Sequence, residues 1–81
     1  MKVRVQFYAQ LRDLAGVQTL DVDLADDAKV SELLETIYGR FPALRNHDKG
    51  ILIGVNLEFV DRNYKLQSSD EIAIMPPVQG G

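Results

Sequence analysis

Apolar and polar residues alternate with a period of two in two segments near the start of the chain. Residues 3–7 place Val, Val and Phe on one face, and residues 20–24 place Leu, Val and Leu on one face. This alternation is typical of strands with one buried face. Because the connection between the segments is short, we expect the two strands to pair antiparallel.

The connection itself has helical character. Good helix formers occupy Ala9–Ala15, and Gly16 follows as a plausible C-cap. We therefore expect a short helix that directs Leu11 and Leu14 inward.

The next pattern has the spacing of an amphipathic helix. Apolar residues recur at i, i+3, i+4, i+7 and i+11, which predicts about three turns that end before Pro42. The apolar positions are Val30, Leu33, Leu34, Ile37 and Phe41. Lys29 stands where a capping side chain is expected, so we expect fraying at the start, although Glu32 suits the positive end of the helix dipole.

The rest of the chain predicts a loop and three more strands. Residues 43–50 are polar and predict a loop, whereas Ile51–Val55 is an apolar run that suits a strand covered on both faces. Asn56 favours a turn, Leu57–Val60 a short strand, and Glu71–Met75 the last strand.

This order of elements predicts an α+β domain in which a mixed sheet of about five strands packs on one main helix. That is the β-grasp, or ubiquitin-like, arrangement, with a domain at residues 1–75 and a flexible Gly-Gly tail at residues 76–81. The predicted core consists of Val3, Val5, Phe7, Leu20, Val22, Leu33, Leu34, Ile37, Phe41, Ile72 and Ile74.

The amino-acid composition argues against some classes of partner. Twelve acidic and nine basic residues are scattered along the chain and give a net charge of −3, which argues against a nucleic-acid partner. The chain has no cysteine, no signal-like opening and no apolar stretch long enough to span a membrane. We therefore expect a cytoplasmic protein without a membrane partner.

The C-terminal residues are the best candidate for chemistry. Pro76 and Pro77 end the last strand, and Gly80 and Gly81 leave the terminal carboxylate without neighbouring side chains, so that it can enter a narrow channel. Adenylation would give that carboxylate a good leaving group and open it to a sulfur nucleophile. With no cysteine and a lone His47, no other reactive group stands out. The alternative is an inert end of small residues.

Several segments together resemble a known family. These are residues 7–16 (Phe-Tyr-Ala-Gln-Leu-Arg-Asp-Leu-Ala-Gly), Val55–Asn56, Asp70–Ala73 and the ending Met-Pro-Pro-Val-Gln-Gly-Gly at 75–81. In this combination the whole chain resembles the small, sulfur-carrying subunits of molybdopterin synthases, which are ubiquitin-like β-grasp proteins.

The resemblance implies a carrier without an active site, a metal or a permanently bound cofactor of its own. An activating enzyme would use ATP to adenylate Gly81, and a sulfur donor would convert it to a thiocarboxylate. The tail, including Val78 and Gln79, would then enter the large subunit of a hetero-oligomeric synthase, expected to be a heterotetramer. There it would give sulfur to a pyranopterin precursor, and the partner would supply the general bases and the substrate pocket.

The resemblance also implies docking residues. Tyr8, Phe59 and Met75 would form an apolar patch on the outer face of the sheet, and Arg12 would pair with acidic groups of the activating enzyme. The simpler alternatives are scattered exposed apolar residues and a solvated arginine. Two residues depart from the family pattern, because Met75 replaces a common Phe and Gln79 a smaller residue.

Other functions stay open at this point. The same chemistry could serve the thiazole of thiamin, a thiolated tRNA base or protein conjugation. A different class would be a β-grasp interaction module with an inert tail. The acidic residues Asp21, Asp23, Asp26 and Asp27 are best explained as a solvated surface rather than a cation site.

Overall fold

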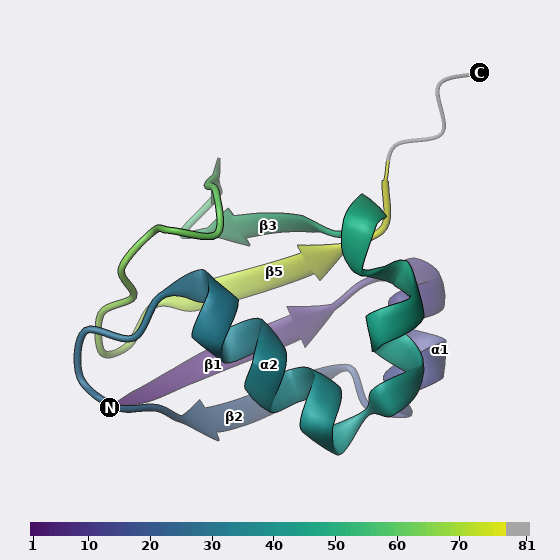
Figure 1. Ribbon diagram of the computed structural model, residues 1–81, viewed down its shortest axis with the longest axis horizontal. Helices are drawn as coiled ribbons and strands as arrows, with labels where there is room; N and C mark the ends of the chain where they lie inside the picture. The colour runs from purple at the N-terminus through teal and green to yellow at the C-terminus, as the bar shows by residue number, and fades with distance from the viewer. Residues whose placement is uncertain (78–81) are drawn as a thin grey trace.

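One mixed sheet organises the molecule. The computed structural model describes residues 1–77, and within them five strands lie in the order β2-β1-β5-β3-β4 (Figure 1). The strands are β1 (Lys2–Phe7), β2 (Thr19–Asp23), β3 (Leu52–Val55), β4 (Glu58–Phe59) and β5 (Glu71–Met75). The strands expected from the alternating and apolar segments are therefore all present.

The pairing of the strands confirms the predicted topology. β1 pairs antiparallel with β2, as the short connection predicts, and parallel with β5. β3 pairs antiparallel with β5 on one side and with β4 on the other. The parallel pair at the centre requires a crossover, which the main helix supplies.

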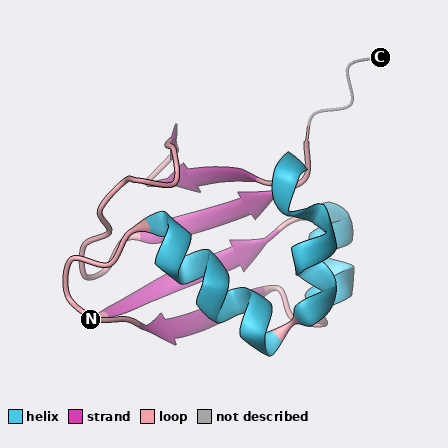
Figure 2. Ribbon diagram, viewed as in Figure 1, coloured by secondary structure: helices cyan, strands magenta, loops and turns pink. Residues whose placement is uncertain are grey.

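The helices α1 (Ala9–Ala15), α2 (Val30–Arg40) and the 3₁₀ helix η1 (Pro42–Gly50) cover one face and one end of the sheet (Figure 2). α2 lies across one face, while α1 and η1 gather at the end of the sheet where β1 and β5 finish. Gly16 closes α1 with φ 76°, as expected for a left-handed C-cap. This is the β-grasp fold predicted from the sequence.

The core lies between α2 and the sheet. It includes the predicted inward residues of β1, β5 and α2, and adds residues of η1, β3 and the segment before β5. The buried apolar residues are Val3, Val5, Phe7, Leu11, Ala15, Val22, Ala28, Val30, Leu33, Leu34, Ile37, Tyr38, Leu44, Ile51, Ile53, Val55, Leu66, Ile72 and Ile74.

Three side chains that were predicted to be buried are only partly buried or are exposed. Leu20 and Phe41 are only partly buried, because Leu20 lies on the edge strand β2 and Phe41 follows the last turn of α2. Leu14 is 40% exposed, since the short helix α1 packs through Leu11 and Ala15 instead. Leu11 is fully buried, as predicted.

The start of α2 is tied down by the chain that precedes β5. The amides of Val30 and Ser31 donate to the carbonyls of Tyr64 and Arg62, each over 3.0 Å. These bonds satisfy amides that a capping side chain would otherwise serve. Hydrogen bonds to residues far along the chain therefore replace the capping side chain that Lys29 does not provide. They hold the first turn of α2, where fraying was expected.

The expected loop at residues 43–50 is wrong. The segment forms η1, because Pro42 suits a first helical position and Leu44 is fully buried. Because Leu44 stands among polar residues, the segment has no apolar periodicity from which a helix could be predicted. As a result, the end of α2 continues into a second helical segment beside α1.

Candidate functional site

The outer face of the sheet, turned away from α2, brings the predicted docking residues together. Gly54 of β3 pairs with Ala73 of β5 on one side and with Phe59 of β4 on the other. Residues paired across strands share a face, so Phe59 lies on the same face as Ala73. Met75 follows on that face, two residues after Ala73.

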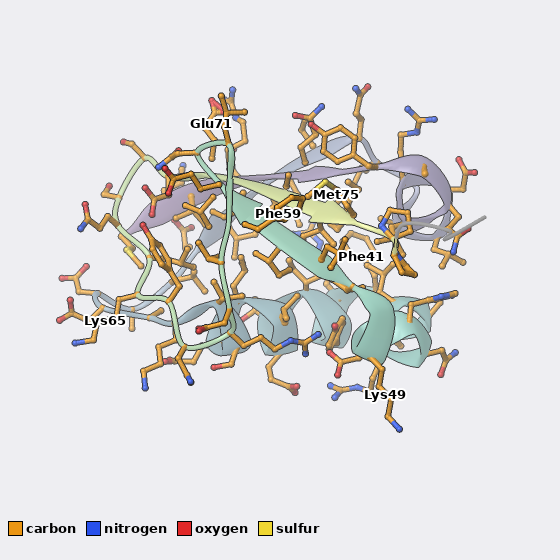
Figure 3. The ribbon with its side chains drawn as sticks, turned by 90° about the horizontal axis from the view of Figure 1, so that it is seen from above. Phe41, Lys49, Phe59, Lys65, Glu71 and Met75 are labelled. Carbon is orange, nitrogen blue, oxygen red and sulfur yellow. The ribbon has the colours of Figure 1, made fainter. Side chains whose placement is uncertain are left out.

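These residues line a hollow of about 610 Å³ that we call the outer hollow. Its apolar and small lining residues are Tyr8, Gly54, Leu57, Phe59, Ile72, Ala73 and Met75. Phe59 is 72% and Tyr8 40% exposed. Figure 3 shows Phe59 and Met75 near each other on the sheet, whereas Lys49 projects outward from η1 on the helical side. Apolar side chains left open in one hollow are typical of a protein-binding surface.

The floor of the outer hollow consists of small residues. A Cβ atom added to Gly54 would lie 3.4 Å from Cε of Met75 and 3.7 Å from Cβ of Ala73, which is ordinary contact distance. The sheet therefore tolerates a side chain here, but that side chain would fill space beside Met75 and Ala73 on the floor of the outer hollow. A glycine inside a strand is typical of a place where another group approaches closely.

Leu57 belongs to the outer hollow, and sequence reasoning missed it. Asn56 and Leu57 both have positive φ, 50° and 75°, and form the tight turn between β3 and β4. Such a turn favours glycine or asparagine in its second position, yet here a leucine occupies it and is completely exposed. An apolar residue at this turn position is the signal that could have found it.

Side-chain hydrogen bonds hold this turn in place. The Asn56 amide nitrogen donates to a carboxylate oxygen of Asp70 over 2.9 Å, and the amide of Glu71 donates to the Asn56 side-chain oxygen over 3.0 Å. The second Asp70 oxygen accepts from the amide of Gln67. Two segments quoted for the family resemblance, Val55–Asn56 and Asp70–Ala73, are thus joined in space, and they fix Leu57 and Phe59 above the sheet.

The remaining predicted site residues are placed differently. Arg12 is exposed on α1 and does not line the outer hollow. Pro76 is half-buried and Pro77 exposed, directly after β5. Val78, Gln79, Gly80 and Gly81, with the prediction of a flexible tail, lie outside the described residues.

A polar cluster fastens η1 on the helical side. Asp48 accepts hydrogen bonds from the Tyr38 hydroxyl over 2.5 Å and from a guanidinium nitrogen of Arg62 over 2.6 Å. These two bonds hold the pKa of Asp48 below its usual value. Burial, with the bond to Asp48, raises the pKa of Tyr38. The cluster joins α2, η1 and the segment before β5, and therefore has a structural role.

A metal site elsewhere in the described part of the chain would need several histidine or acidic side chains close together. Within residues 1–77, no three histidine or acidic side chains come close enough together to hold a metal ion. His47 lies half-buried in η1 rather than in the predicted loop. None of the helices in this same range has both the length and the apolar character needed to cross a membrane.

Comparison with known proteins identifies the family. The model of the ThiS family matches residues 5–81. The chain belongs to the ThiS family. This membership agrees with the β-grasp sheet.

Relatives of this ThiS-family chain divide into two kinds. The chain is 36% identical to the molybdopterin synthase sulfur carrier subunit of Chlamydomonas reinhardtii, with all of both chains covered, which confirms the resemblance seen in the sequence. It is also 30% identical to a candidate molybdopterin converting factor, subunit 1, from Pyrococcus furiosus, with a TM-score of 0.89 and 96% and 99% of the chains covered. The second kind is represented by the small archaeal modifier protein 1 of Methanosarcina acetivorans, which is 30% identical, with a TM-score of 0.82 and 99% and 96% coverage.

Proposed function

We propose that this chain is the sulfur carrier subunit of a molybdopterin synthase, and that the Gly81 carboxylate carries the sulfur. The proposal is supported by the similarity to carriers of that name over the whole chain. The observation that carries it is the position of the outer hollow. Met75 lines the hollow and is also the last residue of β5, so a partner docked there meets the chain where the tail begins.

The charging reaction needs an activating enzyme and ATP. A Gly81 carboxylate oxygen attacks the α-phosphorus of ATP, pyrophosphate leaves, and an acyl-adenylate forms. A hydrosulfide equivalent from the sulfur donor attacks the carbonyl carbon, and AMP leaves with the oxygen. The net change is one oxygen replaced by one sulfur, which gives a thiocarboxylate.

Sulfur delivery uses the large subunit of the synthase, with which the chain forms a hetero-oligomer in this proposal. The outer hollow takes an apolar surface of the partner, and the tail reaches the partner's site. The thiocarboxylate sulfur attacks a carbon of a pyranopterin precursor and displaces an oxygen leaving group. Water then cleaves the bond between that sulfur and the Gly81 carbonyl carbon, which leaves the sulfur on the precursor and restores the carboxylate. Arg12, outside the hollow, adds an ionic contact to the activating enzyme. We place these events in the cytoplasm.

Intact mass spectrometry tests the proposal. The protein is incubated with an activating enzyme, ATP and a sulfur donor, and then with large subunit and precursor. The mass should rise by the difference between sulfur and oxygen in the first step and return in the second. Deleting Gly81 should abolish the rise without changing the urea unfolding curve, whereas the control His47→Ala should behave as the natural chain. Full molybdopterin formation by the truncated protein would refute the proposal.

Protein conjugation is the second candidate, because a small archaeal modifier protein is 30% identical to the chain, as is the Pyrococcus furiosus protein. In that case the adenylated Gly81 would form an isopeptide bond with a lysine amine, and AMP would leave. Adding lysine-containing target protein in place of precursor separates the two. A covalent adduct together with a thiocarboxylate that ignores the precursor would favour conjugation. A thiocarboxylate used only for thiamin thiazole or a tRNA base would instead move the proposal to another sulfur pathway.

A further inference from the structure

The last residue of η1 lies against the first residues after β5. A Cβ atom added to Gly50 would lie 3.0 Å from Cγ, 3.3 Å from Cδ and 3.6 Å from Cβ of Pro77. The first distance is shorter than the usual contact between carbon atoms. Gly50 does not have a positive φ, so the backbone does not require glycine here. Space for Pro77 is the reason for the glycine.

Strand register explains why these two residues meet. β3 and β5 run antiparallel, with Ile53 opposite Ile74 and Leu52 opposite Met75. Each step back along β3 corresponds to one step forward along β5, so two further steps place Gly50 opposite Pro77. Proline has no amide hydrogen to continue the sheet. At this position the Pro77 ring lies against Gly50 instead of continuing the ladder of hydrogen bonds.

The surface that Pro77 meets is itself fixed. The carboxylate of Asp48, two residues before Gly50, is held by Tyr38 and Arg62. On the other side of Gly50, Ile51 is buried, and its amide donates to the carbonyl of Asp48 over 3.4 Å. The end of η1 is therefore a firm support rather than a loose loop.

We propose that Gly50 is a positioning residue for the tail. By leaving room for Pro77, it sets the place and direction in which the chain departs from the domain, relative to the outer hollow. This inference rests on the proposed function, because the tail must enter a partner while the outer hollow is docked. A side chain at position 50 would crowd Pro77, and Gly50 is not among the residues that line the outer hollow.

The expected kinetic effect is selective. Docking through the outer hollow is unchanged, so KM for the carrier should stay within about twofold. The fraction of docked carriers whose carboxylate reaches ATP should fall, and a misplacement of this kind lowers kcat by about tenfold or more.

The test compares Gly50→Val with a matched control, Gly39→Val. Gly39 is exposed on α2, and a Cβ atom there would meet nothing within 4 Å. Pyrophosphate release by the activating enzyme with ATP gives kcat and KM for each carrier. Gly50→Val should lose kcat at unchanged KM, and Gly39→Val should match the natural chain. A wild-type kcat for Gly50→Val would overturn the inference.

A second substitution separates positioning from a general structural defect. Pro77→Ala removes Cγ and Cδ, the two atoms closest to the new side chain, so it should restore most of the kcat lost in Gly50→Val. In the natural chain Pro77→Ala should lower kcat, but by less than Gly50→Val, because it loosens the contact without pushing the chain aside. If Pro77→Ala fails to rescue Gly50→Val, the contact does not position the tail.

Nuclear magnetic resonance provides a readout that does not depend on the proposed function. Nuclear Overhauser effects between the Gly50 α-protons and the Pro77 ring protons should be present in the isolated natural chain and lost in Gly50→Val. If the natural chain is never adenylated but shows these effects, the proposed function fails while the Gly50 contact stands. If the effects are absent from the natural chain, the inference fails even where adenylation proceeds.

Discussion

Both faces of the sheet carry apolar residues, but they use them differently. On the inner face, Val5, Phe7 and Ile74 are buried under α2 and contribute to folding. On the outer face, Phe59 and Tyr8 remain open to solvent around a floor of small residues. Apolar burial stabilises by about 25 cal/mol for each Å² removed from water. The inner face obtains this stabilisation within the chain, whereas the outer face is available for a partner.

The largest effect should come from the inner face. Leu33→Ala leaves a cavity beneath α2, where Leu33 is fully buried, and should lower the free energy of unfolding by about 3 kcal/mol. Urea denaturation measures this loss. Below the transition the variant should still bind the large subunit with natural affinity. A loss of affinity without a loss of stability would show that the inner face takes part in docking.

On the outer face, a substitution should weaken binding to the large subunit and leave stability nearly unchanged. Phe59→Ala should weaken binding to the large subunit by about 2 kcal/mol, because an exposed aromatic beside a hollow is a typical binding hot spot. Its free energy of unfolding should change by less than about 0.5 kcal/mol. Isothermal titration calorimetry and urea denaturation measure the two quantities.

Leu14→Ala is the matched control for Phe59→Ala. Leu14 is also an exposed apolar residue, but it does not line the outer hollow. The control should keep natural affinity. Equal losses in both variants would mean that exposed apolar surface, rather than the outer hollow, determines binding.

The polar cluster behind α2 should affect stability and not docking. Asp48→Asn weakens the charged bond to Arg62, which is about one-third exposed, and should cost about 1 kcal/mol after allowance for solvent screening. Because the folded pKa of Asp48 is lowered, its contribution is present above the ordinary carboxyl pKa and is lost as the pH falls through the folded value.

Urea denaturation between pH 7 and pH 2 measures that dependence. The stability difference between the natural chain and Asp48→Asn should be constant near neutral pH and should shrink below about pH 4. A difference that grows as the pH falls would contradict the assignment. Tyr38→Phe, which removes the other bond to Asp48, should shift the loss toward higher pH.

The smallest effect on stability is expected at Leu57, where stability and binding to the large subunit should change in opposite directions. Leu57→Gly relieves a left-handed leucine and should raise the free energy of unfolding by about 0.5 kcal/mol. It also removes an exposed side chain from the outer hollow and should weaken binding by about 1 kcal/mol. Stability and affinity should therefore move in opposite directions. If the variant is more stable but binds the large subunit with natural affinity, Leu57 does not belong to the docking surface.

The fold could be predicted largely from local patterns. The period of two in β1 and β2 and the helical spacing in α2 each report one buried face, and these elements have nearly the expected bounds. η1 was missed because a single buried residue, Leu44, anchors it among polar neighbours. Leu14 was misjudged because a helix of seven residues offers too few positions to define its buried side.

The candidate site, like the fold, could be predicted from the sequence only in part. Tyr8, Phe59 and Met75 could be named from strand parity and from the family resemblance, and the structure brings them to one hollow. Leu57 and Gly50 could not be named, because their roles depend on a positive φ and on a contact between residues far apart in the chain. The role of Gly81 is still a prediction, since it lies outside the described residues.

The sequence by itself determined which faces are apolar and where the strands and the main helix run. These properties follow from residue order, because side-chain periodicity and backbone chemistry are local. The tertiary structure decided that the outer apolar residues meet in one hollow, that Asn56 is fastened to Asp70, and that Gly50 makes room for Pro77. Those relations depend on strand register and packing, which bring together residues that no local pattern connects.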